Sequence, residues 1–122
     1  MEQVSEMNLD YLLMLLKEID RSSSIDREEL KTNLKELVEN ILKLQYWEVE
    51  EGRNYQHWQS VVSISRSCIQ KLLESHPYLQ EYMEQIYPDL YRNVVNTWQV
   101  KFYIPNNIPI ELTQILKQNY FG

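Results

Sequence analysis

Aromatic and basic side chains gather on both sides of one loop centred on Gly52, and these residue types bind helices or stack bases. If the flanking helices fold back on each other at Gly52, the rings and the cations meet at one end of the hairpin. The predicted binding surface comprises Lys43, Tyr46, Trp47, Arg53, Tyr55, Trp58 and Arg66. In the alternative interpretation, Tyr55 and Trp58 only close the end of the core, while Tyr46 and Trp47 lie half exposed.

Carboxylates beside the same loop are the candidates for metal-assisted hydrolysis. Glu48, Glu50 and Glu51 precede the glycine, and Glu39 lies near them on the same predicted helix. Two converging carboxylates can hold Mg²⁺ or Mn²⁺. Consecutive carboxylates at a helix end more often point apart into water, and the helix dipole disfavours them there. We therefore predict no metal site from this cluster.

The other residues that could do chemistry lack the partners that chemistry requires. His57 and His76 have no second His or Cys at ligand spacing, and Cys68 lies in an apolar helical stripe. With two glycines in the chain, a phosphate-cradling loop is not expected. The sequence therefore predicts no catalytic residue, no metal and no cofactor.

Length and charge limit the class of protein. A chain of 122 residues predicts a single domain, residues 1–122. The apolar run at residues 11–16 is too short to span a membrane, and the N-terminus lacks the basic start of a secretion signal. We therefore expect a cytoplasmic protein that does not enter membranes. The net charge is −6, and residues 1–51 hold 13 acids against six bases, which disfavours nucleic-acid phosphates as partners.

Helical periodicity decides the fold class. Apolar residues recur at helical spacing in residues 9–19, 26–50, 54–74, 79–86 and 90–98, with a short last helix at 110–117. The serines at residues 22–24 are expected to separate the first two helices, and Pro88 to cause a further break or a sharp kink. Residues 101–109 contain two prolines and are expected to cross the bundle in an extended conformation. We predict an all-α fold, a compact bundle of about five helices with a long antiparallel central hairpin and a short C-terminal helix.

Several motifs occur in a characteristic order. An acidic, leucine-rich helix at residues 12–20 precedes NILKLQY at residues 40–46; Trp58, Val62, Arg66, Ile69 and the block LLESHP at residues 72–77 follow. This order and spacing resemble the bacterial family known as domain of unknown function 29, common in cyanobacteria. Its members carry a "LIEEIE" helix, a "HLLKWQ"-like motif and a later block with "LLE.SPSL". The resemblance covers most of the chain and implies a small all-helical bacterial protein without an assigned activity.

The chain departs from the pattern of that family at three places. Members usually begin with an aromatic "DFYAW"-type helix, which we expect this chain to lack. Asn40 stands at the histidine of the "HLLKWQ"-like motif, and Gln59 at the arginine that follows the tryptophan. If those residues carry chemistry in the family, the resemblance implies that this chain has lost it.

These observations favour a non-enzymatic interaction module that binds a protein partner or a second copy of itself. The apolar stripes are wide enough for packing between molecules. A second hypothesis is a nucleic-acid-associated protein, such as a toxin–antitoxin component, that uses Lys43, Arg53 and Arg66 beside the aromatic rings. A third is a metal-dependent hydrolase that uses Glu39 and Glu48.

Overall fold

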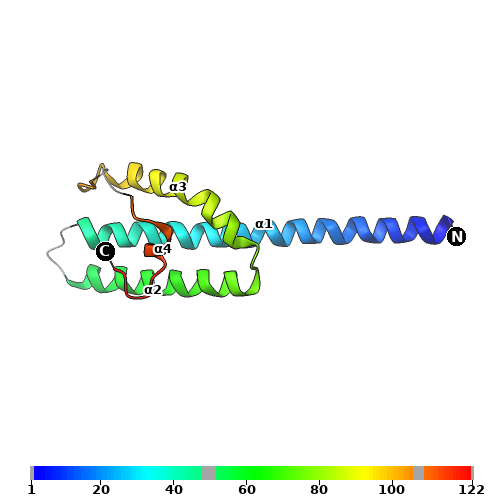
Figure 1. Ribbon diagram of the computed structural model, residues 1–122, viewed down its shortest axis with the longest axis horizontal. Coiled ribbons are helices and arrows are strands. Elements are labelled where there is room, and N and C mark those ends of the chain that lie inside the picture. Colours follow the sequence, from blue (N-terminus) through cyan, green and yellow to red (C-terminus); the bar gives the residue numbers. More distant parts are fainter. Residues whose placement is uncertain (1, 48–51, 106–108, 122) are drawn as a thin grey trace.

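The structure is a computed structural model that describes residues 2–47, 52–105 and 109–121 of the chain. These residues form four helices and no strand, and the predicted all-α class is confirmed. The helices are α1 (Glu2–Tyr46), α2 (Gly52–Ser75), α3 (Leu79–Trp98) and α4 (Leu112–Ile115). Figure 1 shows α2 running antiparallel beside the C-terminal half of α1, which is the predicted central hairpin, with α3 lying across it.

The core is centred on one face of α1. Leu30, Leu34, Leu37, Ile41 and neighbouring apolar residues recur every three or four positions, so they share one stripe, and each is fully buried. Each fully buried leucine contributes roughly 1.5–3 kcal/mol to folding. We call this stripe of residues 30–42 the α1 seam, and α2, α3 and α4 all pack against α1.

The predicted break at residues 22–24 is wrong, because α1 continues through the three serines. Serine costs only a few tenths of a kcal/mol relative to alanine in a helix, whereas a break would leave unpaired backbone groups at two new termini. The helix ends at Tyr46, earlier than the predicted end near residue 50, and α2 begins at Gly52, earlier than the predicted start near Asn54. The loop expected to be centred on Gly52 therefore lies before this residue. Glu48, Glu50 and Glu51 lie outside the described residues.

Helix α3 runs as one element through Pro88, so the predicted division into two helices is wrong. Proline removes one helical hydrogen bond and disfavours the turn before it by about 3 kcal/mol. Burial of Met83 and Leu79 before the proline, and of Leu90 and Val94 after it, holds both halves of α3 against the core. Figure 1 shows the ribbon of α3 changing direction along its length.

The chain after α3 returns across the bundle as predicted. Residues 101–105 and 109–111 are not helical, and Ile104 anchors this crossing in the core. The short helix α4 then buries Ile115. Nowhere among the described residues is there a helix with the length and hydrophobicity needed to cross a membrane.

A pair of leucine substitutions on α1 tests which part of this helix belongs to the bundle. Leu37→Ala empties a fully buried position and is expected to lower the free energy of unfolding by about 2–5 kcal/mol. Leu12→Ala, at an exposed position, is expected to change it by less than about 0.5 kcal/mol. Urea denaturation measures both values, and similar losses in the two variants would contradict the assignment of the core.

Candidate functional site

Four aromatic rings pack together where α1, α2 and α3 come to the same end of the bundle. The Trp47 ring lies between Trp58 and Phe102, with centroid distances of 5.3 Å to each and interplanar angles of 25° and 15°. Trp98 completes the group, tilted and 6.0 Å from Trp47. Stacked and tilted pairs of this kind each add about 0.5–1.5 kcal/mol beyond simple burial. We call these four residues the tryptophan stack; it fastens the end of the central hairpin to the end of α3.

Lys43 closes the side of this stack. Its Nζ lies 4.2 Å from the Trp98 ring centroid and 5.9 Å from that of Trp58, so the ammonium group faces both π-systems. Burial lowers the pKa of Lys43; Glu39 acts in the opposite direction, and the nearby Lys101 lowers it further. Lys101 itself lies 5.1 Å from the Trp98 ring. Two cations therefore share one indole, an arrangement that keeps positive charge close to the aromatic surface.

The structure brings together only part of the predicted binding surface. Lys43, Trp47 and Trp58 meet in or beside the tryptophan stack, and Trp58 is buried, as expected for a residue that closes the core. Tyr46 is partly buried against the core, whereas Tyr55 is exposed on α2. The side chain of Arg53 lies outside the described side chains.

Arg66 lies away from the stack and connects α2 to the C-terminal segment. It is only 6% exposed. Its Nε donates to the carbonyl of Ile115 at 2.9 Å and its Nη1 to that of Gln118 at 3.1 Å, while Nη2 donates to the carbonyl of Tyr120. The guanidinium also lies 5.5 Å from the Phe121 ring. Arg66 is thus directed into the fold, a placement that disfavours the predicted contact with an external ligand.

Burial lowers the pKa of the Arg66 guanidinium, and Tyr120 raises it. An arginine remains protonated under all ordinary conditions, so the three hydrogen bonds are charge-assisted. They satisfy carbonyls that follow or end the short helix α4, which has too few residues to form a stable helix alone. A single side chain of α2 therefore bonds three carbonyls of the C-terminal segment, in addition to the burial of Ile115 in the core.

The residues considered for catalysis do not assemble within the described parts of the chain. No group of three or more His, Cys, Asp or Glu residues there is placed to hold a metal ion. His76 Nε2 lies 3.3 Å from Asp26 Oδ2 and connects the turn before α3 to α1, whereas His57 is exposed. Asn40 is buried, and its side-chain amide donates to the carbonyl of Glu36 within α1, at 2.7 Å.

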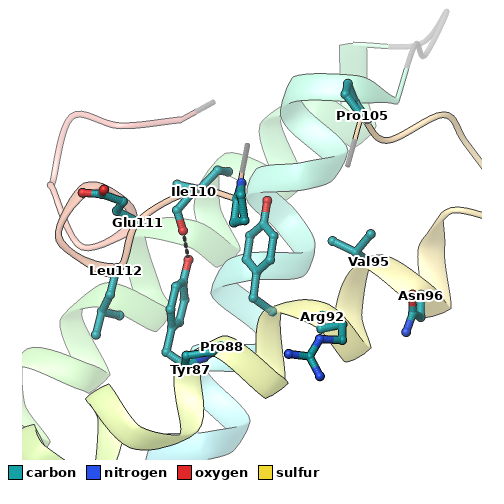
Figure 2. Close-up of a pocket in the computed structure, with 11 residues that line it drawn as sticks. Tyr87, Pro88, Arg92, Val95, Asn96, Pro105, Ile110, Glu111 and Leu112 are labelled. Atoms are coloured by element: carbon teal, nitrogen blue, oxygen red, sulfur yellow. Dashed lines mark hydrogen bonds between the residues drawn. The ribbon is translucent and has the colours of Figure 1, made fainter. Parts of the chain in front are cut away.

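A groove of about 750 Å³ lies between α3 and the returning segment. In Figure 2, Tyr87 reaches from α3 to the carbonyl of Ile110, to which its hydroxyl donates at 2.6 Å. Leu112 lies toward one end of the groove, and Val95 and Pro105 lie toward the other. Aromatic, aliphatic and proline side chains supply most of the lining, so the groove offers apolar contact and little that could perform chemistry.

The N-terminal half of α1 projects beyond the bundle, as Figure 1 shows. We call residues 2–25 the α1 arm. At its centre Leu12 is 55% exposed, Leu13 49% and Met14 58%. Near its base Ile25 is exposed as well. The helical spacing of these apolar residues predicted a helix here. It did not indicate that the rest of the described chain leaves their side chains exposed.

The fold and its surfaces define a class: an all-α bundle with a projecting helical arm, in which the described residues form no metal cluster. Comparison with known families matches residues 2–121 to the domain of unknown function DUF29. The chain belongs to this family, and the resemblance predicted from its motifs is confirmed. No match was found among curated proteins or among solved structures.

Replacement of Arg66 tests its role in the fold. Arg66→Met keeps much of the apolar stem but removes the three donors, and we expect the free energy of unfolding to fall by about 3 kcal/mol, since hydrogen bonds to charged groups contribute about 1.5–3 kcal/mol. Arg92→Met is the control, because Arg92 is exposed and pairs only with Asp89. Hydrogen exchange should show loss of protection in residues 112–120 of Arg66→Met alone. Equal stability of the two variants would contradict this role.

Tyrosine burial predicts a loss of stability at alkaline pH. Burial raises the pKa of Tyr87, and Tyr91 and Tyr120 raise it further. The unfolded side chain ionises near pH 10, so this contribution is fully present below about pH 10 and is lost as the pH rises toward the higher folded value. Tyr87→Phe should lower stability at pH 8 by about 1 kcal/mol, through loss of the bond to Ile110, yet weaken the alkaline decline.

Urea denaturation between pH 8 and pH 11.5 measures both effects of Tyr87→Phe. Tyr103→Phe is the matched control, because Tyr103 is exposed on the returning segment. The control should follow the wild-type curve throughout. An alkaline decline that is equally steep in Tyr87→Phe and in the wild type would contradict the prediction.

Proposed function

We propose that this protein is a non-enzymatic interaction module that docks to another protein through the α1 arm. The observation that carries the proposal is the exposure of Leu12, Leu13 and Met14, three consecutive apolar side chains. Large apolar surface that remains in contact with water usually marks a site of interaction. The arm also stands apart from the bundle, where a partner has access to it (Figure 1).

Helix geometry strengthens this interpretation. Consecutive residues of an α-helix point about 100° apart, so Leu12, Leu13 and Met14 face three different directions. Since each is about half exposed, no described part of the chain covers the arm on the sides where these three residues lie. Most of the stability of a helix in a protein comes from packing of its apolar face, and the arm lacks such packing at these residues. Docking would both bury the apolar side chains and stabilise the helix.

The aromatic residues at the end of the hairpin are a weaker candidate for the docking surface than the arm. Trp47 and Trp58 stack on each other and Arg66 donates to carbonyls of the same chain, so these side chains already serve the fold. Their apolar area is largely used within the bundle, whereas that of the arm is not. The arm therefore has more apolar surface to contribute to a complex.

Substitutions on the arm test the proposal without altering the core. The double variant Leu12→Gln/Leu13→Gln keeps residues that form helices well but removes apolar surface from the arm. It should lower the recovery of stoichiometric partners from the native host at least about tenfold, which corresponds to a loss of about 1.4 kcal/mol of binding free energy. Ile64→Gln is the matched control, because Ile64 is an equally exposed apolar residue on α2. Recovery should be unchanged in that control. Partners that bind the double variant as well as the wild type would contradict docking through the arm.

A further inference from the structure

We propose that the partner surface for the α1 arm is a groove on a different protein, apolar along its floor and walls and basic at the end that receives the N-terminus of α1. This inference rests on the proposed docking function and adds the shape and the charge of the partner surface that would bind the α1 arm. It commits to a different protein, and not to a second copy of this chain, as the partner.

The shape follows from the distribution of apolar residues around the arm. Residues 11–16 read YLLMLL, an uninterrupted apolar run that covers more than one full helical turn. A helix with one apolar stripe needs one flat neighbour, but a helix that is apolar on all sides must be surrounded. The six residues of this run are spaced around the whole helix, and the three with described side chains, Leu12, Leu13 and Met14, are each about half exposed in a different direction. A groove between two elements of the partner can cover apolar residues on several sides of the arm, whereas a single partner helix can cover only one side.

The charge follows from the residues that flank the run. Residues 2–10 contain Glu2, Glu6 and Asp10 and no base, whereas residues 17–21 balance Glu18 and Asp20 with two bases. The negative charge of the arm is thus concentrated at its N-terminal end. Partner groups near that end are therefore expected to be Lys or Arg, which attract it and speed association.

The same charges argue against a second copy. The chain carries a net charge of −6, with 13 acids against six bases in residues 1–51. Two parallel arms would place one acidic end beside the other. Two antiparallel arms would place residues 2–10 beside residues 17–25, whose two acids and two bases cancel, so that pairing supplies no net positive charge to attract the acidic end. Repulsion between like charges weakens association at low ionic strength, and at high ionic strength the charges are screened and do not strengthen it.

Site-specific photo-cross-linking in the native host tests shape and charge together. p-Benzoylphenylalanine, which keeps the position apolar, replaces Leu12, Leu13 or Met14 in separate variants, and Ile64 in the control. Cross-links from all three arm positions should reach one protein, on at least two separate segments of it, and exceed those from position 64. A partner contacted on a single segment, or from one arm position only, would overturn the groove.

Charge-neutral variants complete the experiment. Glu2→Gln/Glu6→Gln/Asp10→Asn should lower the cross-linking yield about tenfold, while Glu18→Gln/Asp20→Asn should change it less than about twofold. An unchanged yield in the triple variant would overturn the basic end of the groove. Cross-links between two copies of the chain would overturn the inference but leave docking through the arm intact. No cross-links from any arm position would remove the proposed function as well.

Discussion

Burial of the α1 seam is the interaction on which the rest of the structure depends. The other three helices pack against α1, and the seam side chains at residues 30, 34, 37, 38, 41 and 42 have no exposed surface. Polar contacts hold the segments that follow α3 against this core. Arg66 holds the C-terminal segment, and Tyr87 holds the returning segment through the carbonyl of Ile110. Both contacts join segments that are held in place by packing against α1.

The same helix carries the main constraint on function. At 1.5 Å per residue, the 45 residues of α1 extend over about 67 Å, which is longer than the bundle that covers the seam. Its leucine-rich pattern does not stop where the bundle stops. Residues 12–14 therefore present apolar side chains to solvent that the described chain does not cover. A single continuous helix thus joins a folded core to a surface that we propose to be a docking element.

Local sequence patterns predicted the fold class, the seam and the central hairpin, because helical periodicity records which face is buried. The loop expected on Gly52, Arg53 and Asn54 was wrong in position, because α2 already begins at Gly52. They were wrong about a break at residues 22–24, where α1 continues, and about a division into two helices at Pro88, where burial on both sides of the proline keeps α3 one element. The alternative predicted for Pro88 was a bend within one helix, and the ribbon of α3 does change direction along its length (Figure 1). Part of the site could be predicted, since Lys43, Trp47 and Trp58 are near one another in sequence. Trp98 and Phe102 could not, because only the path of α3 brings them to the stack, and nothing local distinguishes Arg66 from a surface arginine.

Native-state amide hydrogen exchange along α1 of the isolated protein distinguishes a buried seam from an uncovered arm. We expect two regimes in one helix: amides of residues 30–42 exchange only through global unfolding, and those of residues 12–14 exchange through local opening at a free energy near zero. The boundary between the regimes should fall between Ile25 and Leu30, where burial begins. Protection of residues 12–14 as strong as that of the seam, in the isolated monomer, would contradict the account, because it would mean that the chain covers its own arm.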